Sequence, residues 1–442
     1  MTTTAEAVYL TPEDLRVGLH VHLDLSWMEH PFPSANFKIK NDDQIATIRS
    51  LKLKRIRYSP ELSDGAVPGP VAPTASETVA AGTAAEPAAP AAPAAPVASN
   101  AATAAAAAAA QPAAQARAAR QAERRAARKT CERELLEAAR AFKSLSRNVY
   151  ALPDESRETA QGMVHNLAGT LLSDTDVTLH LMADQVGGEL VYQHALNVAL
   201  LAMMLARALK APAGAIELIG LGALFHDIGK IDIPERLWRS SDPLTRAEQA
   251  LVQQHVPGGV EIARKMALPA EVQQIITQHH ELVDGSGYPK KLKGTQISLL
   301  ARIVAIANVY DKLCNPLNAS FSLSPREALA AMYGLQRSKF DDAALTAFVR
   351  CMGIYPPGTL VGLSDGSVGM VVAVNASQPL KPVVLVYDPA VPREAALLVA
   401  LEEEPDLAID KTPKASELDP AAAAYLGARA RMTYGFEAGK KA

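Results

Sequence analysis

Histidines are concentrated in one part of the chain, where an aspartate directly follows one of them. Five of the ten histidines lie there, each in or beside an apolar stretch with helical spacing. The residues of this group are His194, His226, Asp227, His255, His279 and His280. A single buried histidine is usually a hydrogen-bonded core residue. Five on consecutive helices, with an adjacent carboxylate, favour inward-pointing metal ligands.

The ligand types indicate which metals and which chemistry this group would support. Imidazole and carboxylate suit iron, manganese or zinc, and none of the cysteines lies near these motifs. The two carboxylate oxygens of Asp227 could bridge two ions. Such a pair of ions polarises phosphate oxygens and activates water at neutral pH, so the pattern predicts phosphoester hydrolysis.

The segment HHELVDGSGYP, residues 279–289, joins the paired histidines to a glycine-rich loop that ends in Tyr-Pro. The pair could be two neutral imidazoles that fill space, or two metal ligands at the edge of a loop that receives a substrate. Because other histidines could share a metal with them, we favour ligands. The glycines would let the loop turn back over the site.

Apolar helices must position these side chains. His194 lies beside ALNVALLAMMLARAL, and His226 follows AIELIGLGALF. Asn197, Arg207 and Glu217 interrupt these stretches, which therefore predict buried core helices rather than membrane spans. Helical patterns with few β-rich runs continue to residue 353, so we expect a mainly α fold with an all-helical domain.

The remaining segments differ in composition. Residues 1–60 predict a small α+β domain, with a strand at 19–25, a helix capped by Asn41 and a second strand in RIRYS. Residues 61–117, rich in Ala and Pro, predict a disordered linker, helical at most in the poly-Ala run. Residues 118–185 predict a basic helix and lead-in helices, and residues 354–442 a β-rich extension with a short helix near its end.

Bulk composition narrows the class of protein. The formal charge of −3 gives no general reason to expect a nucleic-acid or acidic-lipid partner. Arginines of the basic helix could contact such a partner, but a solvated helix face is the favoured interpretation. Three widely spaced cysteines suit free thiols in a reducing compartment. The start lacks the pattern of a signal peptide, so we expect a cytoplasmic protein.

Together, HDIGKIDIP and HHELVDGSGYP at this separation resemble the HD-GYP family, a branch of the HD metal-dependent phosphohydrolases. The resemblance covers residues 186–353. SWMEHPF, near the start, resembles an uncharacterised domain that often precedes this domain in bacterial proteins. The family resemblance implies a helical HD-type bundle with two, sometimes three, iron or manganese ions. It also implies hydrolysis of the second messenger cyclic di-GMP to pGpG or GMP.

Site roles follow from the resemblance by position. His194, His226 and Asp227 would bind one metal, and Asp227 would bridge to a second metal. The ligands implied for that second metal are His255, His279 and, as a further candidate, His280. Lys230 would steady the scissile phosphate. The loop at the substrate mouth would be formed by Asp284, Gly285, Gly287, Tyr288 and Pro289.

Three positions depart from the family pattern. Asn308 stands where the family has its last aspartate ligand, and an amide oxygen brings no charge to a metal. Leu190 stands where members with three metals have a glutamate, so we expect two metals. CNPLNASF replaces a segment with arginines that can touch substrate phosphates. The remaining candidate phosphate contacts are Arg302, Lys290 and Lys291, although a surface charge is the favoured interpretation of each.

Three functions therefore remain open. The leading one is a cyclic di-GMP phosphodiesterase with two metals. The second is a catalytically weak module that binds a nucleotide or a partner protein, and the third is a hydrolase of another nucleotide. The resemblance also allows GGDEF-type or other signalling proteins to dock on the loop of residues 284–289, called the GYP loop below. It allows a homodimer as well.

Overall fold

The computed structural model divides the chain into two compact units, Met1–Ala118 and Ala119–Ala442. It describes residues 8–23, 36–39, 41–50, 53, 55–64, 100–172, 178–182, 190–239, 243–375, 378, 380–404, 406–428 and 431–437. SWMEHPF, residues 26–32, lies outside the described residues, as does most of the expected linker.

The first unit is a small α+β domain, as the sequence predicts. Its elements are β1 (Val8–Leu10), β2 (His20–His22), β3 (Asn36–Lys38), α1 (Asp42–Ser50) and β4 (Ile56–Tyr58). The strands form an antiparallel sheet in the order β1-β4-β2-β3. Asn41 Oδ1 accepts a hydrogen bond from Gln44 N at 3.0 Å, which confirms the expected helix cap. Ile45 and Ile48 of α1 join the strand residues in one apolar core.

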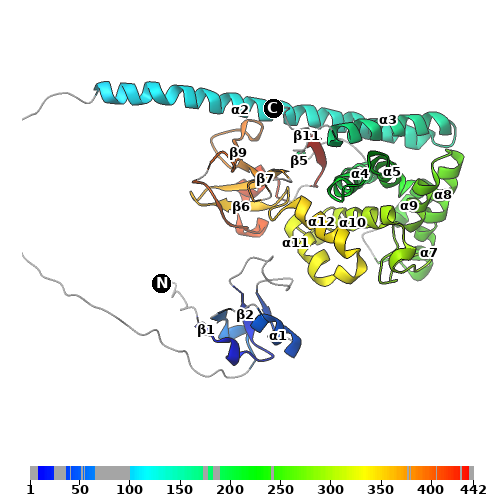
Figure 1. Cartoon of the computed structure of the whole chain (residues 1–442), viewed down its shortest axis with the longest axis horizontal. Helices are drawn as coiled ribbons and strands as arrows, with labels where there is room; N and C mark the ends of the chain where they lie inside the picture. Colours follow the sequence, from blue (N-terminus) through cyan, green and yellow to red (C-terminus); the bar gives the residue numbers. More distant parts are fainter. Residues whose placement is uncertain are drawn as a thin grey trace, which may run out of the picture. The chain divides into compact units, whose positions relative to one another are not determined.

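The second unit is mainly helical (Figure 1). Its helices include α3 (Pro153–Leu172), α4 (Leu190–Ala208), α5 (Ala213–Phe225), α6 (Glu235–Trp238), α7 (Arg246–Gln253), α8 (His255–Lys265) and α9 (Ala270–Gln278). They continue with α10 (Leu299–Cys314), α11 (Pro325–Ala330), α12 (Asp342–Met352) and α13 (Pro420–Leu426), and the short helix η3 (Ile228–Asp232) follows α5. The expected helical bundle is therefore present.

Helix α4 lies at the centre of this bundle and packs against α5, α10 and α12. Its apolar residues between Ala195 and Ala206 are buried, as expected for a core helix that is hydrophobic all round. Asn197 is the buried polar exception within this stretch. Within the described residues, no helix is both long and apolar enough to cross a membrane.

A sheet packs beside the bundle. Its strands are β5 (Thr178–Leu181), β6 (Leu360–Leu363), β7 (Val368–Asn375), β8 (Val383–Val386), β9 (Leu398–Ala400), β10 (Ile409–Lys411) and β11 (Tyr434–Glu437). The main order is β10-β6-β7-β5-β11, and β8 pairs with β7 and β9. Strand β5 comes from the region expected to hold only lead-in helices, so that expectation is wrong. Leu179, His180 and Leu181 are all buried, which fits a strand that lies between β7 and β11 inside the sheet.

Helix α2 (Asn100–Asn148) begins inside the expected linker, because alanine has the highest helix propensity. Its later part runs beside the sheet (Figure 1). Arg124 pairs with Glu403 at 2.6 Å, and Arg125 donates to the carbonyl of Ala395. These arginines therefore bind the C-terminal extension. The sequence had favoured a solvated face for the arginines of this helix and did not predict these contacts.

Candidate metal centre

Helix ends place the histidines and the aspartate at one point. His226 directly follows α5, and Asp227 directly precedes η3. His255 is the first residue of α8, and His279 directly follows α9. His194 comes from the first turns of α4. Helices meet there because their apolar faces pack against α4 and α9, so sequence-distant ligands converge.

The side chains form two groups that could each hold a metal ion. His194, His226 and Asp227 make one group, and Asp227, His255, His279 and His280 make the other. In each group the ligand atoms lie within 4.8 Å of one another. Asp227 Oδ2 lies 3.3 Å from His226 Nε2, and Asp227 Oδ1 lies 3.3 Å from His255 Nε2. One carboxylate oxygen therefore faces each group.

Backbone carbonyls select the tautomer of three of these histidines. The Nδ1 atoms of His226, His255 and His279 lie 2.6, 2.7 and 2.8 Å from carbonyl oxygens three residues earlier in the chain. Each Nδ1–H donates to its carbonyl, so each Nε2 carries a lone pair that points into the site.

The inward-pointing lone pairs meet each other without a proton between them. His226 Nε2 lies 3.2 Å from His194 Nε2, and His255 Nε2 lies 3.4 Å from His279 Nε2. Asp227 Oδ1 is buried and has no hydrogen-bond partner among the described residues. Acceptors gathered in this way repel one another unless cations lie between them. The donor set therefore fits two divalent metal ions.

Burial keeps the histidines neutral. It lowers the pKa of His255 and of His279, each to about 4, and lowers the pKa of His226 and His280 as well. A neutral imidazole is the form that binds a metal. At neutral pH the histidines are thus ready to act as ligands.

Asp227 is ionised. Burial by itself would raise the pKa of this carboxyl, but the ammonium groups of Lys230 and Lys312 hold it well below its usual value. Lys230 Nζ lies 2.6 Å from Asp227 Oδ2. Lys230 thus lies at the site, where the resemblance places it.

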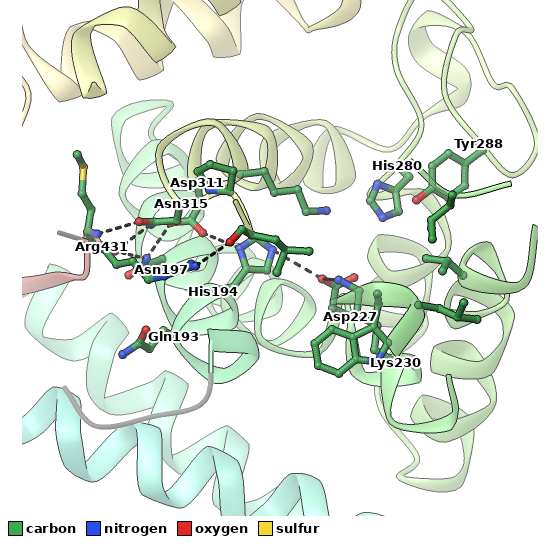
Figure 2. Close-up of a pocket in the computed structure, with 18 residues that line it drawn as sticks. Gln193, His194, Asn197, Asp227, Lys230, His280, Tyr288, Asp311, Asn315 and Arg431 are labelled. Atoms are coloured by element: carbon green, nitrogen blue, oxygen red, sulfur yellow. Dashed lines mark hydrogen bonds and ion pairs between the residues drawn. The ribbon is translucent and has the colours of Figure 1, made fainter. Parts of the chain in front are cut away.

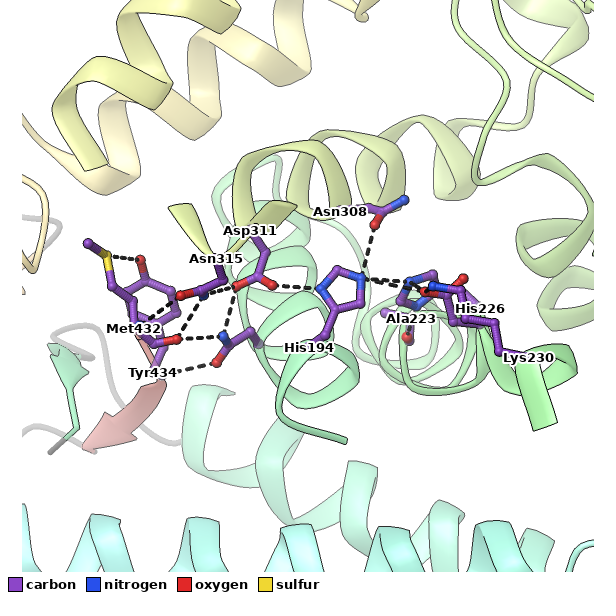
Figure 3. Close-up of polar contacts among 11 residues, drawn as sticks. His194, Ala223, His226, Lys230, Asn308, Asp311, Asn315, Met432 and Tyr434 are labelled. Atoms are coloured by element: carbon purple, nitrogen blue, oxygen red, sulfur yellow. Dashed lines mark hydrogen bonds and ion pairs between the residues drawn. The ribbon is translucent and has the colours of Figure 1, made fainter. Parts of the chain in front are cut away.

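Asn308 also lies at the site. Its Oδ1 is 3.1 Å from His194 Nε2, so an amide oxygen occupies the edge of the first group (Figure 3). Glu189 and the side chain of Leu190, on which the expectation of two rather than three metals depends, lie outside the described residues.

The GYP loop folds back over the second group. The Tyr288 ring stacks on His280, with ring centroids 4.4 Å apart and planes tilted by 22°. A Cβ on Gly287 would lie 2.4 Å from the carbonyl oxygen of His280, so only glycine allows this approach. Buried Glu281 holds the turn because its carboxylate accepts hydrogen bonds from the backbone N–H groups of Lys290 and Leu292.

The loop residues differ in their access to substrate. Tyr288 lines the pocket described below. Asp284 instead accepts hydrogen bonds from the backbone and hydroxyl of Ser286, which stabilises the turn. Gly285, at φ +82°, and Pro289 shape the backbone and do not line the pocket.

Arg302 does not reach the pocket. Its guanidinium pairs with Asp341, the residue that caps α12, and both side chains are largely buried. This ion pair ties α10 to α12, which favours a structural role over the phosphate contact that the sequence left open for Arg302.

A pocket of about 430 Å³ opens on the metal groups (Figure 2). Its lining includes His194, Asp227, Lys230 and His280, together with apolar residues such as Trp238. Lys312 also lines it, and burial lowers the pKa of this ammonium to about 8. This size and mixture of apolar walls and polar groups is typical of a small-molecule site.

A buried polar network stands behind His194 (Figure 3). Asp311 Oδ2 lies 2.6 Å from His194 Nδ1, and Asp311 Oδ1 accepts from the amides of Asn197 at 2.8 Å and Asn315 at 2.9 Å. Both amides also donate to the carbonyl of Met432, each at 2.9 Å. A carboxylate on the far nitrogen fixes the orientation of a ligand histidine.

The sequence interpretation missed most of this network. Helical spacing could have indicated Asn197, three residues after His194, and Asn315, four after Asp311, since such pairs share a helix face. Arg431 and Met432 gave no signal, because they lie in a segment far along the chain.

Comparison with known proteins agrees with this geometry. A family model described as an HD domain matches residues 171–344, a range that holds every residue of the two metal groups. Residues 171–344 of this chain are therefore similar to HD domains. Residues 10–160 match a domain of unknown function, DUF3391, which confirms the resemblance of the N-terminal module to an uncharacterised domain.

Relatives of this chain include proteins named as phosphodiesterases. A cyclic di-GMP phosphodiesterase of Pseudomonas aeruginosa is 33% identical over 229 residues, which are 52% of this chain and 55% of the relative. A 3′3′-cGAMP-specific phosphodiesterase of Vibrio cholerae is 34% identical over 159 residues, 36% of this chain and 28% of the relative. This chain thus spans about half of the first relative's length and less of the second.

A solved structure also resembles part of this chain. An HDG"Y"P protein from Bdellovibrio bacteriovorus is 23% identical and matches with a TM-score of 0.38. The match covers 47% of this chain and 69% of that one.

Proposed function

We propose that this protein is a metal-dependent phosphodiesterase that hydrolyses cyclic di-GMP to pGpG or GMP with two iron or manganese ions. The observation that carries the proposal is the position of Asp227, whose two carboxylate oxygens face two groups of histidines. Two ions bound there would polarise the oxygens of a phosphodiester and lower the pKa of a water.

The chain's own residues would position the substrate. Lys230, at the pocket wall beside Asp227, is placed to steady the scissile phosphate by its positive charge. Asp311 holds the His194 ring through Nδ1 so that its Nε2 faces the site. Trp238 and its apolar neighbours exclude water from the reacting groups.

The substrate class rests on the relatives and on the loop. The relatives compared are named for activity on cyclic dinucleotides, which differ in their bases. The Tyr288 ring, stacked on His280 at the pocket, offers an apolar face beside the metal groups. A cytoplasmic location and docking of signalling proteins on the loop belong to the same proposal.

Asn308 supports one alternative. An amide in place of a carboxylate removes one negative charge from the first group, so that group would hold its ion less tightly. A protein that loses this ion would act by binding a nucleotide or a partner rather than by hydrolysis.

Turnover of cyclic di-GMP decides between these functions. The protein is purified without oxygen, supplied with ferrous iron or manganese, and its products are resolved by chromatography. We expect pGpG or GMP from the wild type and none from His226→Ala or Asp227→Ala, which should also lose their metal. His165→Ala is the control, because this exposed histidine pairs with Glu217 on the surface. A folded, metal-loaded wild type that forms no product would favour the binding module.

A further inference from the structure

One wall of the pocket comes from outside the matched HD domain. Arg431 and Met432 line the same pocket as Asp227 and Lys230, although the HD match ends at residue 344. Figure 2 shows Arg431 at one side of the pocket and Tyr288 at the other, with His194 between them. A C-terminal residue therefore brings a positive charge to the end of the pocket away from the GYP loop.

Hydrogen bonds anchor this segment firmly. The Met432 carbonyl accepts from the side-chain amides of Asn197 and Asn315, and the Met432 N–H donates to Asn315 Oδ1 at 2.8 Å. Tyr434 N donates to Asn197 Oδ1 at 3.2 Å. Because both amides are tied to Asp311, the backbone beside Arg431 is held in fixed register with the metal groups.

The guanidinium is placed to bind a ligand. Arg431 Nη2 donates to the carbonyl of Leu317 at 3.3 Å, across the pocket rim from the metal groups. A guanidinium has five N–H donors, so this contact orients the group and leaves donors for a ligand. Pro316 and Leu317, which line the pocket there, bring no charge of their own.

A cyclic dinucleotide has two phosphodiesters on opposite sides of its ring, and the metal groups can act on one at a time. The second phosphate must then lie elsewhere along the pocket. We propose that Arg431 binds this second, non-scissile phosphate, an inference that rests on the proposed phosphodiesterase function. Planar guanidinium groups bind phosphate oxygens in pairs, which suits this task.

The test compares two substrates. Cyclic di-GMP has a second phosphate, whereas bis(p-nitrophenyl) phosphate has a single phosphodiester and offers Arg431 nothing to hold. For Arg431→Gln we expect KM for cyclic di-GMP to rise about tenfold or more, with kcat within about twofold. Hydrolysis of bis(p-nitrophenyl) phosphate and metal content should stay unchanged. Arg431→Lys should recover part of the loss.

The matched control is Arg350→Gln, which removes the same charge from an exposed position on α12. A readout without turnover comes from equilibrium dialysis of cyclic di-GMP in the presence of a chelator. There too the dissociation constant of Arg431→Gln should rise about tenfold, and that of the control should not.

Each outcome has one meaning. If the wild type hydrolyses cyclic di-GMP and Arg431→Gln does so with an unchanged KM, the inference about Arg431 is overturned. The proposed phosphodiesterase function is then still supported. Equal losses on both substrates also overturn it, because they would indicate damage to the metal groups. A wild type that hydrolyses bis(p-nitrophenyl) phosphate but no cyclic dinucleotide overturns the proposed function, and this inference with it.

Discussion

Individual residues decide whether this site can hold metal. Three histidines donate Nδ1–H to their own helix ends, and His194 has the carboxylate of Asp311 on its Nδ1. Each of these four rings thus presents Nε2 to the site, and Asp227 offers an oxygen to each group. Asn308 is an uncharged side chain beside the first group, and its effect on metal affinity can be measured.

Asn308→Asp should tighten metal binding. A carboxylate at this position adds a negative charge 3.1 Å from His194 Nε2, where the first ion would be bound. We expect the metal dissociation constant to fall by roughly one order of magnitude. Metal retained after dialysis against a chelator measures this, with Asn166→Asp at an exposed position on α3 as the control. Unchanged retention would mean that Asn308 is not a ligand.

Asp311→Asn should weaken metal binding without altering a proposed ligand. The amide cannot act as a charged acceptor for His194 Nδ1, so the orientation and basicity of the ring are lost. Outer carboxylates of this kind are worth about tenfold to a hundredfold in metal affinity. Asp341→Asn, which breaks an ion pair remote from the pocket, should keep full affinity. Equal affinities in the two variants would contradict the positioning role of Asp311.

Acid should destabilise the metal-free protein. His255 and His279 have a pKa of about 4 when folded, whereas unfolded histidine has a pKa of about 6.5. The unfolded chain therefore binds protons first, and the free energy of unfolding falls as pH drops from about 6.5 to 4. The loss is on the order of 3 kcal/mol for each histidine. Denaturant titrations across this range measure it, and a flat profile would refute the burial argument.

At the scale of elements, the contact between η3 and α8 sets the distance between Asp227 and His255. Gly229 of η3 packs directly on the α8 backbone, and a Cβ there would lie 2.0 Å from the carbonyl oxygen of His255. Neighbouring Gly258 on α8 has no described atom closer than 4.0 Å to such a Cβ. Alanine substitutions at Gly229 and Gly258 therefore form a matched test, because only the first would create a clash.

Gly229→Ala should force η3 away from α8 and separate the two ligands. We expect a loss of about 2 kcal/mol or more in the free energy of unfolding, together with loss of metal. Gly258→Ala should be neutral or stabilise by about 0.5–1 kcal/mol, since alanine suits a helix interior. Thermal unfolding and metal analysis of both variants test this. If the two variants have the same stability and metal content, the contact between η3 and α8 does not set the distance between Asp227 and His255.

At the scale of the whole molecule, the second unit works as one body because its last strand completes its core. Strand β11 pairs with β5, and Cys131 of α2 donates to the carbonyl of Phe436. Met432 satisfies the amides of Asn197 and Asn315 behind the metal groups. The C-terminal extension, expected as an appendage, is part of the domain that holds the site.

Ending the chain at Ala428 should therefore damage the distant metal groups. The two buried amides would lose their partner, at a cost of about 1–3 kcal/mol each, and His194 would lose its support. We expect a lower melting temperature and weaker metal retention. Removal of residues 1–64 is the comparison, because every residue of the metal groups lies in the second unit. A truncated chain that folds and keeps its metal would contradict this coupling.

By itself the sequence determined which residues are candidate ligands, the helices that carry them and the shared role expected of Asp227. These features are local, since helical spacing and a short motif such as HDIGK lie within a few turns of chain. Tertiary structure alone decided that Arg302 pairs with Asp341 and that Arg431 lines the pocket. Asn315 and Met432 are separated by 117 residues, and only the packing of the sheet against the bundle brings them together.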